Sequence, residues 1–163
     1  HEGRVREQVP QLAHNPAYKV VLVGGGPQER ELRHLLPNAT FMGVLQGEEL
    51  GAAYASLDVF AHTGSHETFC QAVQEALASG VPVVAPRSGG PLDLVADGVT
   101  GFFYEPGSRD DLASHVALLH NDPQLRLRMG RAARKSVAHK SWGAVNAALV
   151  DHYRDVIRAR RLR

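Results

Sequence analysis

The 163-residue chain carries 18 Lys and Arg residues against 17 Asp and Glu residues, and a formal net charge of +1 does not indicate a nucleic-acid-binding protein. A chain of this length with 44% hydrophobic residues can bury the core of one globular domain, and no apolar run approaches the roughly 18–20 residues of a membrane span. The single cysteine, Cys70, excludes an internal disulfide and is compatible with a reducing cytosol. Because the chain starts at His1 rather than at Met, we expect it to be an internal stretch of a longer protein.

Short apolar runs alternate with amphipathic stretches along most of the chain. Residues 1–17 are polar and interrupted by Pro10 and Pro16, and we predict a ragged N-terminal segment there, or the start of a first strand. The apolar runs predict strands over residues 19–23, 39–43, 58–63, 81–86 and 101–106. The amphipathic stretches predict helices over residues 27–36, 47–57, 68–79, a short one from Pro91, and three more over 108–120, 123–138 and 142–160. Gly80 is expected to end the helix over 68–79 in the left-handed conformation.

This alternation predicts an α/β fold, namely a Rossmann-like parallel sheet with helices on both faces. The predicted strands are continuous apolar runs, which are typical of a sheet that is covered on both sides. We expect this domain to span residues 18–140, with a C-terminal helical segment over 141–163. The final RARRLR is expected to be a solvated helix end, and contact with anionic lipid is the alternative.

Ligands of open parallel sheets bind beyond the carboxyl ends of the strands, where this chain places several glycines. Gly24, Gly25 and Gly26 follow the first strand, at the spacing with which a dinucleotide site begins. The third glycine of that motif would fall at Glu29, and the second strand ends without an acidic residue to hold a ribose, so a nicotinamide site is disfavoured. A plain tight turn explains the three glycines equally well.

The helix predicted over 68–79 carries two glutamates eight residues apart, Glu67 and Glu75. One apolar face repeats at helical spacing through Phe69, Ala72, Val73, Ala76 and Leu77. Glu75 falls on the polar side with Thr68 and Gln71, and eight helical steps place the carboxylates about 12 Å apart along the axis. The backbone amides of Thr68, Phe69 and Cys70 would lie between them, suited to a diphosphate or a sugar hydroxyl. Ordinary helix-end electrostatics is the alternative explanation of both glutamates.

The stretch HETFCQAVQEALASGVPVVAPRSGG resembles the E-x7-E region of the retaining glycosyltransferases of family 4, the glycosyl transferases group 1. The stretches VLVGGGP, FMGVLQGEELGAAYASLDVF, DGVTGFFYEPG and SW are similar to further segments of that family in the same order, from about Tyr18 to Tyr153. The resemblance implies the C-terminal, donor-binding half of a GT-B fold. The variant ETFCQ, with cysteine where most members have glycine, is most similar to actinobacterial GDP-mannose-dependent α-mannosyltransferases, which glycosylate lipid acceptors.

The resemblance also implies roles for individual residues. Glu67 would contact the hydroxyls of the donor hexose as the catalytic-site glutamate, and Glu75 would take the ribose hydroxyls. The other donor-binding positions would be Thr68, the amides of Phe69 and Cys70, Gly24 to Gly26 beside the nucleotide, Met42, Gly43 and Val44 beside the base, His66, and Gly89 and Gly90 beside the hexose. The family's Arg and Lys pair at the diphosphate is only partly matched, by Arg4, and a solvated arginine is the alternative there. His62 and His66 are better explained as structural than as catalytic residues.

The family implies transfer with retention by front-face attack, in which the leaving phosphate takes the acceptor proton. The chain has no D-x-D motif and no zinc-like His and Cys spacing, so we expect a nucleotide-sugar substrate, no metal and no cofactor. The acceptor domain would be a separate N-terminal partner, so this chain alone should bind donor weakly and transfer almost nothing. The helix over 141–163 is similar to the segment that crosses back onto that domain, and its apolar residues Val145, Leu149, Tyr153 and Ile157 would be partly exposed in this chain. We expect a cytoplasmic location, with peripheral contact with a membrane that holds a lipid acceptor. The alternatives are a UDP-sugar-dependent transferase, a related sugar-nucleotide epimerase and a non-catalytic scaffold.

Overall fold

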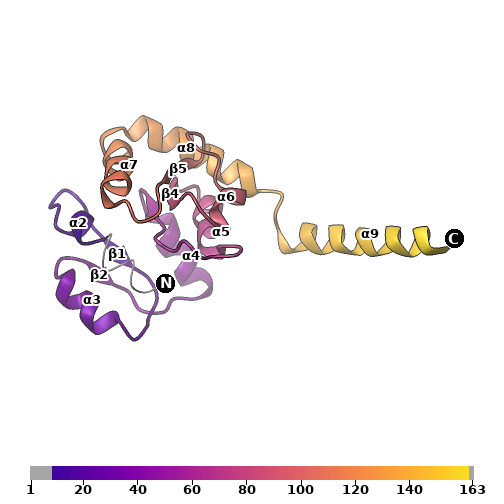
Figure 1. The fold of residues 1–163 in the computed structure, drawn as a ribbon, viewed down its shortest axis with the longest axis horizontal. Coiled ribbons are helices and arrows are strands. Elements are labelled where there is room, and N and C mark those ends of the chain that lie inside the picture. The colour runs from indigo at the N-terminus through magenta and orange to yellow at the C-terminus, as the bar shows by residue number, and fades with distance from the viewer. Residues whose placement is uncertain (1–8, 162–163) are drawn as a thin grey trace.

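The computed structural model describes residues 9–161, and over this range it confirms the predicted α/β alternation (Figure 1). The helices and strands, in chain order, are α2 (Pro10–Ala13), β1 (Val21–Leu22), α3 (Glu29–Leu35), β2 (Thr40–Phe41), α4 (Gly47–Ala55), β3 (Phe60–Ala61), α5 (Gln71–Ala78), β4 (Val83–Pro86), α6 (Pro91–Leu94), β5 (Gly101–Tyr104), α7 (Arg109–Asn121), α8 (Pro123–Val137) and α9 (Trp142–Arg161). Every predicted strand and helix is present, with shorter bounds in most cases.

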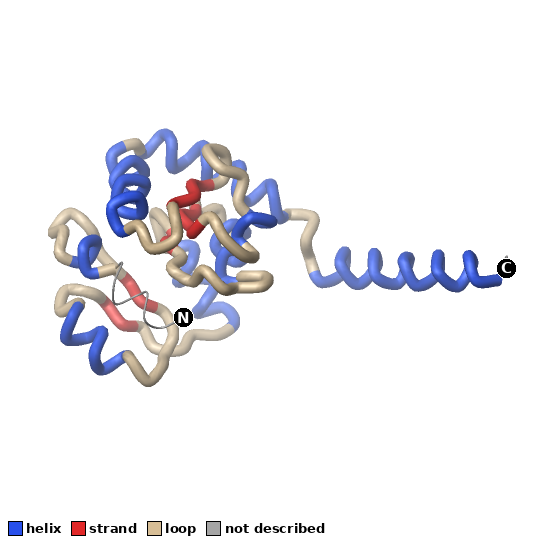
Figure 2. Tube along the Cα trace, viewed as in Figure 1, coloured by secondary structure: helices blue, strands red, loops and turns tan. Residues whose placement is uncertain are grey.

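All strand pairs are parallel, but their hydrogen bonds form two sheets rather than one. β1 pairs with β2, and β3, β4 and β5 pair in that order. The strands are drawn in red in Figure 2. β1, β2 and β3 have only two residues each, which limits how far each ladder extends. Apolar packing joins the two parts, because Val20 beside β1 and Val59 beside β3 pack against the same buried cluster.

β4 lies at the centre of the fold, and its burial on both faces explains why its sequence is a continuous apolar run. Val83 and Ala85 face a cluster that includes Val73 and Leu77 of α5, while Val84 faces a second cluster that includes residues of α2, α7 and α8. Successive strand residues point to opposite faces, so both faces of β4 are covered. Val83, Val84 and Ala85 are all fully buried.

The N-terminal part of the described chain holds a helix that the sequence reasoning missed. Pro10, which was expected to interrupt any element, occupies the first turn of α2. A proline is tolerated there because its missing N–H would have no partner within the helix. Leu12 of α2 is buried against the cluster that contains Tyr104 and Leu112.

The helix α9 projects away from the rest of the molecule (Figures 1 and 2). Every side chain from residue 143 to residue 160 is exposed. The apolar residues Val145, Leu149, Tyr153 and Ile157 are 48%, 47%, 61% and 54% exposed, which confirms the expectation that they are not fully covered. No helix within residues 9–161 has the length and hydropathy needed to cross a bilayer.

Candidate functional site

The predicted donor-binding residues after β1 and β2 lie together. The backbone N–H of Gly24 donates to the carbonyl of Gly43 at 2.7 Å, and both glycines adopt positive φ angles, 121° and 69°. The apolar side chains of Met42 and Val44 beside this contact are 45% and 71% exposed. A hollow of about 210 Å³ borders this turn and is lined by Leu22, Val23, Gly24, Gly25, Gly26, Gln28, Glu29, Leu32 and Phe41.

A second junction joins the loop after β3 to the loop after β4, and it contains Glu67. The backbone N–H of Gly90 donates to the carbonyl of Glu67 at 2.7 Å, and the Ser88 hydroxyl donates to the carbonyl of Ser65 at 3.1 Å. A Cβ atom on Gly89 would lie 2.5 Å from the Glu67 carbonyl oxygen, and one on Gly90 would lie 2.7 Å from the Phe69 carbonyl carbon. Both positions therefore need glycine, and their backbone holds Glu67 in place.

The start of the glutamate-bearing helix differs from the sequence expectation. α5 begins at Gln71, because Cys70 has a left-handed backbone with φ of 61°, which ends the helical geometry on its N-terminal side. Thr68 and Phe69 therefore lie in a loop, and Phe69 is 59% exposed rather than part of the buried face. The helical rise that predicted a 12 Å separation of the carboxylates does not apply to residues 67–70. Within residues 9–161, the backbone N–H groups of residues 68–72 have no hydrogen-bond acceptor.

Cys70 and His62 form a buried contact behind this loop. The Cys70 thiol is 3.3 Å from Nε2 of His62, and Cys70 is 4% exposed. Burial lowers the pKa of His62, against the opposing effects of the Glu67 charge and a hydrogen bond with the Gly64 backbone. Burial also raises the pKa of the Cys70 thiol. Both shifts favour the neutral forms of the two groups, and the contact packs His62 against the buried Cys70 side chain.

Glu75 is held by partners that the sequence reasoning only partly identified. The Gln71 side-chain amide donates to Glu75 Oε1 at 2.9 Å, in agreement with the expected position of both residues on one side of α5. Burial raises the pKa of Tyr54 well above its usual range, and the charge and hydrogen bond of Glu75 raise it further. Tyr54 comes from α4 and packs against Phe60, so its ring resembles a core residue and gives no sequence signal for the contact with Glu75.

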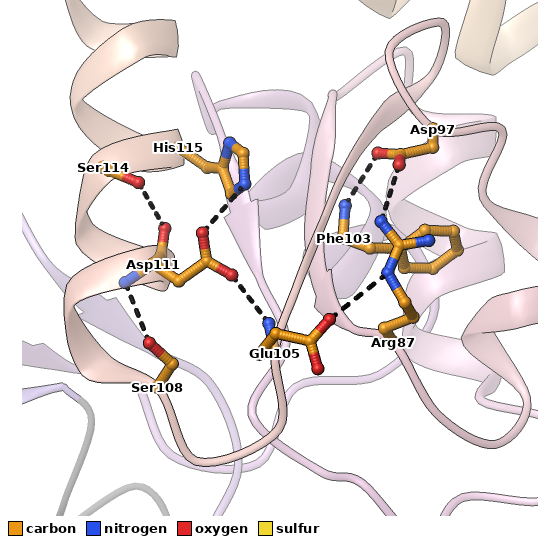
Figure 3. Close-up of polar contacts among 8 residues, drawn as sticks. All are labelled: Arg87, Asp97, Phe103, Glu105, Ser108, Asp111, Ser114 and His115. Atoms are coloured by element: carbon orange, nitrogen blue, oxygen red, sulfur yellow. Dashed lines mark hydrogen bonds and ion pairs between the residues drawn. The ribbon is translucent and has the colours of Figure 1, made fainter.

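A cation that the sequence reasoning missed, Arg87, follows β4 directly and belongs to a polar network (Figure 3). Its guanidinium lies 2.8 Å from Asp97 and 3.6 Å from Glu105, and it stacks over the Phe103 ring at 5.0 Å. Asp111 of α7 accepts the Glu105 backbone N–H at 2.7 Å and so extends the network to that helix. Two carboxylates already compensate Arg87, and the network ties the carboxyl ends of β4 and β5 together.

The remaining predicted residues are placed as follows. His66 is exposed, and its Nδ1 is 3.0 Å from the hydroxyl of the neighbouring Ser65. Arg4 lies outside the described residues. Within residues 9–161, no group of three or more His, Cys, Asp or Glu side chains could hold a metal ion.

Comparison with known proteins identifies related sequences over most of the chain. The family described as glycosyl transferases group 1 matches residues 4–136. The chain is 46% identical over 157 residues to a GDP-mannose-dependent alpha-mannosyltransferase of Mycolicibacterium smegmatis, covering 96% of this chain and 41% of that protein. It is also 46% identical to the protein of the same name in Mycobacterium tuberculosis, covering 92% of this chain and 39% of that protein. The chain therefore spans about two-fifths of the length of these curated relatives, and the resemblance found in the sequence is confirmed.

Solved structures of similar fold include a longer protein and an isolated domain. Sucrose-phosphate synthase from Thermosynechococcus elongatus superposes with a TM-score of 0.81 at 27% identity, covering 94% of this chain and 43% of that chain. The C-terminal domain of LpcC, a glycosyl transferase group 1 family protein from Francisella tularensis, superposes with a TM-score of 0.70 and covers 84% of this chain and 77% of that chain. At 23% identity, the LpcC likeness shows the fold alone.

Proposed function

The chain belongs to the family of glycosyl transferases group 1, and we therefore propose that it binds the nucleotide-sugar donor of a retaining mannosyltransferase, with GDP-mannose as the donor. The observation that carries this proposal is the 46% identity over 96% of the chain to a GDP-mannose-dependent alpha-mannosyltransferase. The geometry supports it, because Glu67 and the glycine pair Gly89 and Gly90 meet at the carboxyl ends of β3 and β4. Ligands of open parallel sheets bind at that edge.

In the proposed complex, the loop of residues 66–70 surrounds the sugar and the diphosphate. The Glu67 carboxylate accepts hydrogen bonds from hexose hydroxyls, and the N–H groups of residues 68–72, which have no acceptor within residues 9–161, donate to the phosphates. His66 borders the same loop. Glu75 accepts the ribose hydroxyls in place of the Gln71 amide, which currently bonds it at 2.9 Å. The exposed Met42 and Val44 border the base, and Gly24 to Gly26 allow close backbone approach.

The chemical demand on this half of the enzyme is electrostatic. Departure of the nucleoside diphosphate develops negative charge on the phosphate, and donors already aimed at that position lower the barrier. In front-face transfer that phosphate also takes the proton of the acceptor, so no second carboxylate is needed across the anomeric carbon. We propose that Arg4 contributes a cation there and that donor binding needs no metal or cofactor. Arg87 is an unsuitable source of that charge, because Asp97 and Glu105 already compensate it.

We further propose that the acceptor is bound by a second domain across a GT-B cleft. The chain covers 41% of a relative's length, which leaves room in such a protein for another domain. The exposed apolar side chains of α9, such as Leu149 and Ile157, fit the role of a helix that packs on that domain. A cytoplasmic protein in peripheral contact with a membrane would match a lipid acceptor. This chain alone should transfer almost no sugar.

Isothermal titration of the chain without added metal tests the proposal, using GDP-mannose, GDP, UDP and NAD. Heat with GDP and GDP-mannose, and none with NAD, is expected. Heat with UDP alone would reassign the donor to a UDP-sugar, while no heat with any nucleotide would contradict the proposed function.

Variants of the two glutamates separate binding from stability. Glu67→Ala and Glu75→Ala should each weaken donor binding by roughly tenfold or more, since each removes a carboxylate that accepts ligand hydroxyls. Glu49→Ala is the matched control, because Glu49 is an exposed first-turn glutamate of α4. Loss of thermal stability without loss of donor affinity would instead support ordinary helix-end electrostatics, and indifference in both assays would support a scaffold.

A further inference from the structure

A hollow in the described part of the molecule lies away from the proposed donor site. It measures about 740 Å³, and its lining includes Asp58 and Pro82, which precede β3 and β4. The donor loops follow the carboxyl ends of the same strands. Because β3 and β4 are parallel, the hollow and the donor loops lie at opposite edges of that sheet.

The hollow is rimmed by cations of α8. Five of the chain's cationic residues lie on this helix, which has no acidic residue. Arg131, Arg134 and Lys135 line the hollow with exposed side chains, and none of them forms an ion pair within residues 9–161. Asp58 is the only acidic residue of the lining, and Arg126 lies 3.6 Å from it.

Arg126 has a different role from the other three cations. Its guanidinium donates to the carbonyls of Leu119 and His120 at 2.7 and 2.8 Å, so it closes the end of α7. Its charge is also compensated by Asp58. The uncompensated charge at the hollow is therefore that of Arg131, Arg134 and Lys135.

The hollow also presents apolar surface beside these charges. Leu127 lines it and is 54% exposed, and Leu57, Pro82 and Pro123 contribute further apolar atoms. A site that combines unpaired guanidinium groups with exposed apolar atoms suits a phosphate group attached to an apolar body.

We propose that this hollow is a second binding site, distinct from the donor loops, that takes a phosphate ester through Arg131 and Arg134. The phosphate would come either from a lipid headgroup at a membrane surface or from a soluble ligand, and the chemistry of recognition is the same. Removing the two guanidinium groups should weaken binding there by roughly 30-fold, because each contributes about 1 kcal/mol and can hold a phosphate with two parallel hydrogen bonds. The proposal does not depend on which nucleotide sugar binds at the opposite edge.

The test compares two double variants of the full chain with the wild type. Arg131→Gln with Arg134→Gln removes the unpaired charges of the hollow. Arg154→Gln with Arg158→Gln is the matched control, because it removes the same charge from α9, where Asp151 and Asp155 partner the two arginines. Probes are inorganic pyrophosphate, followed by titration calorimetry, and phosphatidylcholine vesicles with or without phosphatidylglycerol, followed by sedimentation. Thermal melting of each variant checks that it is folded, and GDP-mannose titration reports the donor site separately.

Binding of either probe that is weaker by roughly 30-fold in the α8 variant and unchanged in the α9 variant would support the proposal, since two surface cations contribute about this much. Binding to phosphatidylglycerol vesicles alone assigns the phosphate to a lipid, and binding to pyrophosphate assigns it to a soluble ligand. No binding of either probe to the wild type, or binding lost equally in both variants, would overturn the proposal. Failure of GDP-mannose binding would contradict the donor assignment without affecting this site.

Discussion

Replacement of Gly90 by alanine tests whether the junction at Glu67 controls donor binding. The added Cβ atom would lie 2.7 Å from the Phe69 carbonyl carbon and 2.9 Å from the Phe69 N and O atoms. Ordinary contact begins at 3.4 Å, and all three neighbours are backbone atoms, so the Phe69 segment itself must move. That movement strains the 2.7 Å hydrogen bond between the Gly90 N–H and the Glu67 carbonyl.

We expect Gly90→Ala to destabilise the protein by about 1–3 kcal/mol, which is the usual cost of overpacking a close contact. It should weaken GDP-mannose binding as well, because Glu67 moves with Phe69. Gly51→Ala is the control, since Gly51 lies within α4 and a Cβ atom there would have no neighbour within 4 Å. That change should stabilise the protein by roughly 0.5–1 kcal/mol and leave donor binding unchanged.

Urea unfolding and nucleotide titration of the two variants provide the measurements. If Gly90→Ala has the wild-type unfolding midpoint and the wild-type donor affinity, the junction does not control the position of Glu67. If it unfolds more easily but binds donor normally, the junction supports the fold only.

Two further predictions concern the residues around this edge of the sheet. Cys70→Ala removes the thiol contact with His62 but keeps the left-handed backbone, and it should lower the free energy of unfolding by about 1–2 kcal/mol. Cys70→Gly relieves the backbone strain, so it should unfold at a higher urea concentration than Cys70→Ala. Burial raises the pKa of Asp97, but its hydrogen bonds with Arg87 and the Phe103 N–H outweigh this and hold the pKa below its ordinary value of 3.8. The stability that this ion pair contributes is therefore present above pH 3.8 and is lost as the pH falls through the lower pKa that Asp97 has in the folded protein. The urea midpoints of the wild type and Asp97→Asn should converge as the pH is lowered. Midpoints that stay equally far apart at every pH would contradict this role of Asp97.

The sequence predicted the features that depend on local pattern. Gly80 has the expected positive φ of 76° after α5, because only glycine enters the left-handed region at low cost. The strands were recognisable because β4 is buried on both faces and shows no polar alternation. Glu67, Gly89 and Gly90 each follow a predicted strand, and the structure brings them together at the carboxyl ends of β3 and β4.

The features that depend on contacts between distant residues could not be predicted in this way. Phe69 fits the helical period of α5, yet the left-handed Cys70 removes it from the helix. Tyr54 has the pattern of a core aromatic, and only the packing of α4 against α5 reveals its contact with Glu75. The cations of α8 have the pattern of a solvated helix face, and the hollow beside them arises from where α8 packs against the end of α5.

Because α9 projects away from the rest of the protein, we expect it to unfold locally. A helix of 20 residues extends about 30 Å, and without packing such a helix is only marginally stable in water. Its amide protons should therefore exchange with solvent through local opening, while those of β4 and α5 exchange only when the whole domain unfolds. Any molecule that covers Leu149 and Ile157 would slow exchange along this helix alone, so amide protection of residues 142–161 would report the arrival of a partner before any activity is measured.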